Sequence, residues 1–258
     1  MTDGMVKLRR DHLPSDLVPH LGAAGITSTV AVQARQTLEE SRWLLGLADE
    51  YPFIGGVVGW VDLNSERVGE QLEPFAQHPK FRGVRHVVHD EADDEFMLRP
   101  SFLNGLSHLE EFGLTYDLLL FPRHLPIARE VVKKFPDQPF ILDHIAKPAV
   151  RSGAMEPWAR DLQRLAVLPN VFCKISGLVT EAHWDSWEAQ TFEPYVEVVL
   201  NAFGPHRLMI GSDWPVCTLA GDYASVMNLE TSYISRLSAD EQRAILEENP
   251  AKFYSIPL

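Results

Sequence analysis

The stretch Pro139-Phe-Ile-Leu-Asp143-His144 decides the fold class, because an uninterrupted apolar run leads directly into two polar side chains. Residues 207–213, Arg-Leu-Met-Ile-Gly-Ser-Asp, repeat this pattern near the end of the chain. Short runs that are apolar throughout, rather than alternating, are typical of strands covered on both faces in a parallel sheet. The two stretches therefore predict an α/β fold with polar groups at the carboxyl ends of its strands.

Five further runs have the same character: Thr27–Ala34, Phe53–Leu63, Phe81–Val88, Leu114–Phe121 and Val171–Ser176. Amphipathic stretches separate them, and capping-box spacing marks helix starts at Thr37 and Ser238. Strand–helix units in series, without β-hairpins, predict either a doubly wound sheet or a TIM-type (β/α)8 barrel. No Gly-x-Gly-x-x-Gly follows the first strand and polar residues recur at strand ends, so we predict a single barrel domain over residues 1–258.

The composition argues against nucleic acid and membranes as partners. The 258 residues include 23 basic and 36 acidic side chains, and the formal net charge of −13 repels phosphate backbones and anionic lipid. The chain starts without the apolar core of a signal peptide, and no apolar run is long enough to span a membrane. Its two cysteines, Cys173 and Cys217, are expected to be free thiols. We therefore predict a cytoplasmic protein.

Asp213 and His144 are the leading candidates for chemistry. Asp213 follows an apolar strand and a Gly-Ser step, where a carboxylate can accept a proton from water or ligate a metal; a turn or N-cap aspartate is the alternative. His144 can polarise a carbonyl or bind a metal, or it can be a hydrogen-bonded core histidine. One of Asp143 and His144 should point into the barrel and the other away, since strand side chains alternate. Lys147 could hold a substrate carboxylate or hydroxyl group.

Arg85 and His86 are candidates for binding an anion or a carbonyl group, because both lie on an apolar strand. A buried arginine is costly unless it is paired or faces a ligand. Asp117, on the following strand, is the candidate partner of Arg85, and that structural role competes with a catalytic one.

Three further side chains near strand ends are candidates for substrate binding. Ser176 can donate a hydrogen bond, but it lacks the Gly-x-Ser-x-Gly pattern of a nucleophile. Arg123 follows the strand that ends at Phe121, and a solvated helix start is its alternative. Trp60 belongs to a set of tryptophans that either wall a pocket or pack in the core: Trp60, Trp184, Trp187 and Trp214.

Four motifs in this order resemble the amidohydrolase-related family: Gly-Val-Arg-His at 83–86, Leu-Asp-His-Ile-Ala-Lys-Pro at 142–148, Lys-Ile-Ser-Gly-Leu at 174–178 and Gly-Ser-Asp-Trp-Pro-Val-Cys at 211–217. They are most similar to its sugar-lactonase branch, the L-fuconolactonases and L-rhamnonolactonases of carbohydrate catabolism, with the 2-pyrone-4,6-dicarboxylate hydrolases as relatives. The resemblance covers nearly the whole chain. It implies hydrolysis of a sugar lactone, with Asp213 as the general base for water and His144 polarising the carbonyl or binding the metal.

The sequence departs from this family at its start. The family's first strand bears a His-x-His pair, and none occurs in this sequence. The resemblance thus predicts a barrel that lacks its first β-strand, and the seven strand candidates agree. The metal site would then hold only His144 and Asp213, so the expected cofactor is one divalent metal ion, zinc by preference, or none.

Two other interpretations stay open. One is hydrolysis, without a metal, of a carboxylated pyrone or unsaturated lactone whose acid groups are held by Arg85, Arg123 and Lys147. The other is a degenerate barrel that binds a ligand without catalysis. The expected partner is a small-molecule lactone, and the sequence does not decide for or against a homodimer.

Overall fold

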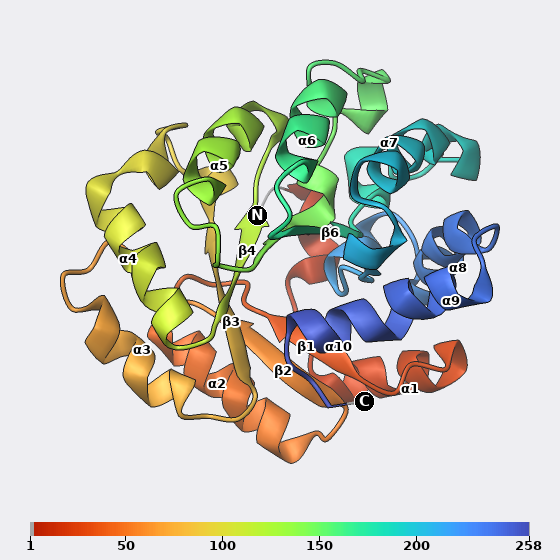
Figure 1. Ribbon diagram of the computed structural model, residues 1–258. Coiled ribbons are helices and arrows are strands. Elements are labelled where there is room, and N and C mark those ends of the chain that lie inside the picture. Colours follow the sequence, from red (N-terminus) through yellow and green to blue (C-terminus); the bar gives the residue numbers. More distant parts are fainter. Residues whose placement is uncertain (1–2, 258) are drawn as a thin grey trace.

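The computed structural model describes residues 3–257. Seven parallel strands form one sheet whose spatial order follows the chain order, so each strand pairs with the next. The strands are β1 (Thr29–Val32), β2 (Ile54–Gly59), β3 (Phe81–Val87), β4 (Thr115–Leu119), β5 (Phe140–Leu142), β6 (Val171–Ile175) and β7 (Leu208–Ile210). Figure 1 shows the sheet curled, with helices around its outside, which is the arrangement of an α/β barrel.

The curl stays open within residues 3–257, because β1 and β7 form its two edges and are not paired with each other. A complete barrel of this type closes with eight strands. The described sheet is therefore a barrel one strand short, which confirms the predicted fold class.

Helices alternate with the strands and cover the outer face of the sheet (Figure 1). A π-helical turn, Ala244–Glu248, joins the last two of them. The α-helices are α1 (Pro14–Ala24), α2 (Leu38–Glu50), α3 (Val68–Ala76), α4 (Pro100–Glu111), α5 (Leu125–Val132), α6 (Trp158–Ala166), α7 (Glu193–Phe203), α8 (Tyr223–Ile234), α9 (Ala239–Arg243) and α10 (Asn249–Phe253).

Both predicted capping sites start helices. The Thr37 hydroxyl accepts a hydrogen bond from the Glu40 amide at 3.1 Å at the start of α2. Ser238 and Glu241 form a complete capping box at the start of α9, in which each side chain accepts from the other residue's amide. These bonds satisfy amide groups that the first helical turn leaves without partners.

The apolar core has two parts. Most buried apolar side chains lie between the strands and the helices. A smaller cluster joins Val58, Ile141 and Met209 of the sheet to Phe253 and Tyr254 at the end of α10. The C-terminal helix therefore fills part of the curl with apolar groups.

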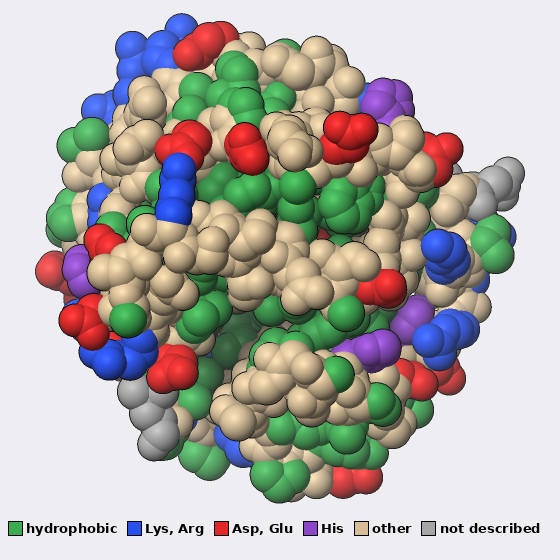
Figure 2. Space-filling view, turned by 90° about the vertical axis from the view of Figure 1, so that its right-hand side faces the viewer, with side chains coloured by type: hydrophobic (Ala, Val, Ile, Leu, Met, Phe, Trp, Pro, Cys, Tyr) green, Lys and Arg blue, Asp and Glu red, His purple; other side chains and the backbone are tan. Residues whose placement is uncertain are grey.

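The surface carries charges of both signs. Figure 2 shows acidic and basic side chains interspersed with apolar ones on one face of the molecule. No helix within residues 3–257 is long and apolar enough to cross a membrane.

All seven predicted strands are present, and each is shorter than predicted. The difference matters most after β5 and β7. There the backbone leaves the extended conformation, and the φ angles of His144 and Asp213 are both 51°. These two turns build the candidate site.

Candidate active site

The turn after β5 brings both Asp143 and His144 into the interior of the curl. Asp143 forms ion pairs with Arg85 of β3 and Lys174 of β6, whereas His144 contacts Ser176 and Asp213 after β6 and β7. The prediction that one of the two would point away is wrong. It assumed that both belong to a strand, but β5 ends at Leu142.

The chain achieves this turn with four consecutive left-handed residues. The φ angles run from 47° to 60°: His144, Ile145, Ala146 and Lys147. Each such residue costs about 1–2 kcal/mol relative to the right-handed region. Strain of this kind persists only where the surroundings fix it, and it is concentrated at functional sites.

His144 and Asp213 form the centre of the site. Nε2 of His144 lies 3.6 Å from Oδ1 of Asp213, and Nδ1 lies 2.9 Å from the Ser176 hydroxyl oxygen. The His144 and Asp213 side chains are 10% and 14% exposed, so each keeps a small area open to solvent. The distance between Nε2 of His144 and Oδ1 of Asp213 is too long for a hydrogen bond, so both groups stay available to a ligand.

Gly177 fixes the position of the His144 ring, and sequence reasoning missed it. A β-carbon at Gly177 would lie 2.7 Å from Nδ1 of His144, and the φ of Gly177 is 64°. Only glycine meets both conditions without strain. The signal in the sequence was the Ser176-Gly177 step at the end of a strand.

Burial sets the protonation states of this pair. It raises the pKa of Asp213 to about 6, although the positive charges of Lys147 and Arg85 act in the opposite direction. Burial also holds the pKa of His144 well below its usual value, against the nearby Asp143 carboxylate, which raises it. Near pH 7 the site therefore holds an ionised Asp213 and a neutral imidazole.

A chain of buried ion pairs lies against this centre. Lys174 contacts Asp143 at 2.7 Å and Asp117 at 2.5 Å, and the Tyr254 hydroxyl donates to Asp117 at 2.8 Å. Arg85 contacts Asp143 at 2.9 Å. The prediction that Asp117 is the partner of Arg85 is wrong, because Lys174 and Tyr254 occupy that carboxylate.

The other two predicted cations are also paired with carboxylates of the chain. Lys147 contacts Glu181 at 2.7 Å. Arg123 contacts Asp94 at 2.7 Å, and its side chain is 48% exposed. Each of these cations is therefore already partly neutralised by a carboxylate of the chain.

Trp60 and His86 lie in a packed cluster of their own. The Trp60 indole donates to Nδ1 of His86 at 3.2 Å, and Nε2 of His86 lies 2.7 Å from Glu91. The His86 ring stacks on Phe96 with 4.7 Å between centroids. These contacts satisfy the ring nitrogens within the protein, and the structure does not join either side chain to His144 or Asp213.

The described residues do not by themselves fit a catalytic zinc ion. Within residues 3–257 no three histidine, cysteine, aspartate or glutamate side chains converge as metal ligands. Catalytic zinc usually takes three protein ligands. His144 and Asp213 supply two, and the neighbouring Asp143 is committed to Arg85 and Lys174.

Comparisons with known proteins agree with the motifs. The chain matches the Amidohydrolase family over residues 6–256. It is 39% identical to the L-fucono-1,5-lactonase of Burkholderia ambifaria over 253 residues, which cover 96% of this chain and 86% of that protein. An amidohydrolase from Burkholderia multivorans, crystallised with bound zinc, superposes with a TM-score of 0.96 at 39% identity and covers 99% of this chain and 93% of its own. The probable 2-pyrone-4,6-dicarboxylic acid hydrolase of Acinetobacter baumannii shares the fold alone, with a TM-score of 0.75 at 19% identity over 96% of this chain and 92% of its own.

Proposed function

Because this chain belongs to the amidohydrolase family, we propose that it hydrolyses a neutral sugar lactone, with Asp213 as the general base. The observation that carries the proposal is the pair of His144 and Asp213, held 3.6 Å apart at the carboxyl ends of β5 and β7. Sites of barrel enzymes are built at this end of the strands. The identity to L-fucono-1,5-lactonases over nearly the full chain supports the substrate class.

The reaction needs only a base and a hydrogen-bond donor. The Asp213 carboxylate accepts a proton from water, and the water oxygen forms a bond to the lactone carbonyl carbon. The carbonyl oxygen becomes an oxyanion. When the Ser176 hydroxyl donates to Nδ1 of His144, the proton of the neutral ring sits on Nε2, which can donate to this oxyanion.

The second half of the reaction reverses the proton transfer. The tetrahedral intermediate breaks its ring C–O bond and re-forms the carbonyl group. Asp213 then returns its proton to the leaving alkoxide, so the carboxylate is regenerated and the product is the open-chain hydroxy acid. Gly177 contributes indirectly, because it allows the His144 ring its position.

The pairing of the cations favours a neutral substrate over a carboxylated pyrone. Arg85, Lys147 and Arg123 would have to hold the acid groups of a pyrone, and each already contacts a carboxylate of the chain. These carboxylates offset part of the positive charge of the three cations and would repel the acid groups of a pyrone. A neutral lactone leaves all three pairs intact.

The proposed steps use only this chain's own groups. Zinc was bound in the crystallised relative from Burkholderia multivorans, whereas His144 and Asp213 supply two ligands here. The proposal also includes a cytoplasmic location. Two free, buried cysteines, Cys173 and Cys217, favour a reducing compartment.

A substrate panel tests the proposal. We expect hydrolysis of L-fucono-1,5-lactone or L-rhamnono-γ-lactone, and no hydrolysis of 2-pyrone-4,6-dicarboxylate. Titration of the released acid in a pH-stat measures the rate. Turnover of the dicarboxylate alone would show that the paired cations do receive acid groups, and it would contradict the proposal.

A further inference from the structure

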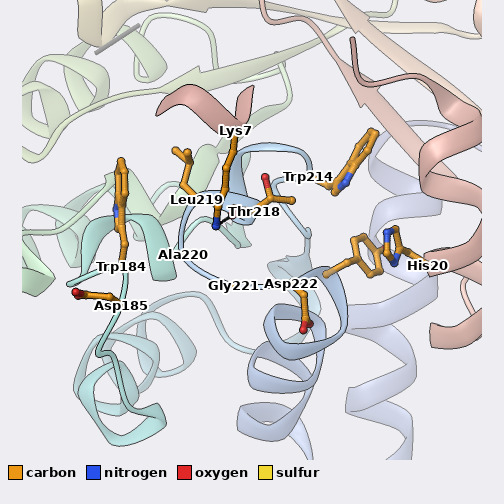
Figure 3. A pocket seen from close by; sticks show the side chains of 11 residues that line it. Lys7, His20, Trp184, Asp185, Trp214, Thr218, Leu219, Ala220, Gly221 and Asp222 are labelled. Atoms are coloured by element: carbon orange, nitrogen blue, oxygen red, sulfur yellow. Dashed lines mark hydrogen bonds between the residues drawn. The ribbon is translucent and has the colours of Figure 1, made fainter. Parts of the chain in front are cut away.

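A cavity of about 590 Å³ is lined in part by Trp214, the residue that follows Asp213. It opens between the loop after β6, the loop after β7 and a short N-terminal 3-10 helix, Asp3–Leu8. Figure 3 shows Trp184 and Trp214 on opposite sides of this cavity, with Lys7 reaching in between them. Its volume lies within the usual range for small-molecule sites.

The cavity and the active site are built by the same loops. Trp214 directly follows Asp213, so one turn supplies both the proposed base and one wall. Glu181, which holds Lys147, lies three residues before Trp184 in the loop after β6. The short helices Val179–Glu181 and Val216–Leu219 of these two loops contact each other. The cavity and the His144–Asp213 pair therefore share the turn at 213–214 and two loops that contact each other.

The Trp184 wall presents its ring rather than a hydrogen-bond donor. The Trp184 indole N–H donates to the Thr180 carbonyl at 2.9 Å, which anchors the ring. Behind the wall, Trp187 donates to the Ala220 carbonyl at 2.7 Å. An aromatic face carries partial negative charge, so it attracts the C–H bonds of hydroxylated carbons, which the neighbouring oxygens make more positive than those of an unsubstituted ring.

The cavity is lined by charges of both signs, without an excess of positive charge. Lys7 and His20 line it together with Asp185 and Asp222. Lys7 also donates to the Thr218 carbonyl at 3.0 Å, so its position is fixed. Donors and acceptors between two aromatic walls suit a neutral, polyhydroxylated ring, and the two aspartates beside one lysine offer no excess positive charge to a dicarboxylate.

We propose that the cavity between Trp184 and Trp214 is the subsite that holds the hydroxylated carbons of the sugar lactone. The inference rests on the proposed lactone hydrolysis and adds to it the residues that distinguish a sugar lactone from a plain one. Trp184 is then a specificity-determining residue that lies apart from the reacting atoms.

The test compares two lactones in matched variants. Trp184→Ala removes the ring face, Trp184→Phe keeps an aromatic face, and Trp43→Ala removes an exposed tryptophan on α2 as a control. For L-fucono-1,5-lactone we expect Trp184→Ala to raise KM about tenfold with kcat nearly unchanged, and Trp184→Phe to restore most of the loss. For δ-valerolactone, which has no hydroxyl groups, we expect KM to change by less than about twofold in every variant.

A binding measurement separates this proposal from the proposed reaction. 1,5-Anhydro-L-fucitol has the sugar ring and hydroxyl groups but no ester, and saturation-transfer NMR detects its binding whether or not any lactone is hydrolysed. We expect binding in the wild type and in Trp43→Ala, and a loss of binding in Trp184→Ala. Equal losses for both lactones in Trp184→Ala, or unchanged anhydrofucitol binding, would overturn the subsite. An absence of lactone hydrolysis in the wild type with anhydrofucitol binding intact would overturn the reaction alone.

Discussion

Replacing Gly177 by alanine should damage catalysis far more than it damages stability. The new β-carbon would lie 2.7 Å from Nδ1 of His144, whereas ordinary contact begins at 3.4 Å, so the ring must recede by about 0.7 Å (3.4 − 2.7). This movement also disturbs the 2.9 Å contact between Nδ1 and Ser176. A misplacement near 1 Å can lower the rate about 100-fold. For this smaller displacement of the ring we expect kcat/KM to fall about 10- to 100-fold.

The stability cost of this change comes mainly from the backbone. The φ of Gly177 is 64°, and a side chain there costs about 1–2 kcal/mol. Gly153 provides a matched control, because its φ is 69° and a β-carbon there would meet no atom within 4 Å. Gly153→Ala should therefore lose a similar free energy of unfolding and keep full activity.

The assay is lactone hydrolysis at saturating and limiting substrate, combined with urea unfolding of the same samples. The reasoning is refuted if the Gly177 and Gly153 variants show the same activity at comparable stability. That result would mean that the position of the His144 ring does not matter for turnover.

Further predictions concern protonation, thiols and metal. Because Asp213 must be ionised and its pKa is raised to about 6, kcat/KM should be flat above pH 7 and fall about tenfold per pH unit well below 6; a flat profile down to pH 5 would contradict this. Glu230 is fully buried, neither carboxyl oxygen has a hydrogen-bond partner, and burial raises its pKa well above 4.5. Between the pKa values of the unfolded and folded states, Glu230 is protonated only in the folded protein, so its contribution to stability falls as pH rises above about 4.3. Urea midpoints should therefore show Glu230→Gln to be more stable than the wild type at pH 8 but not at pH 4. Replacing both Cys173 and Cys217 by alanine should leave activity within about twofold, since both are buried, free thiols; inactivity of a folded double variant would reveal a missed thiol role. Dialysis against a chelator should leave hydrolysis unchanged, because the residues described from 3 to 257 offer no three-ligand site; a loss restored by zinc would show that further ligands exist.

The strands were predictable because they are apolar on both faces. β5 and β7 are each three residues long, yet their apolar runs and the polar residues after them stand out in the sequence. Asp213 and His144 were found by the same reasoning, since the carboxyl ends of parallel strands must meet on one side. The structure indeed brings them within 3.6 Å.

The local geometry of the site was not predictable from these patterns. None of residues 144–147 is glycine, so nothing in the sequence indicates the left-handed turn there. Because of this turn, the side chains of Asp143 and His144 do not alternate as they would in a strand. The partner of Arg85 depends on which side chains cross the interior of the curl. Lys174 extends from β6 across the interior of the curl to Asp117 and Asp143. The strand pattern does not indicate which carboxylates the ammonium group of a half-buried lysine contacts.

Asp213→Asn tests the central claim most directly. The amide keeps the size of the side chain but cannot accept a proton from water. We expect hydrolysis of L-fucono-1,5-lactone to fall at least about 1,000-fold, with 1,5-anhydro-L-fucitol binding and urea stability retained, as expected when a general base is lost. Asp137→Asn, at an exposed position, is the matched control and should remain fully active. An Asp213→Asn variant that turns over the lactone at a rate near that of the control would contradict the account.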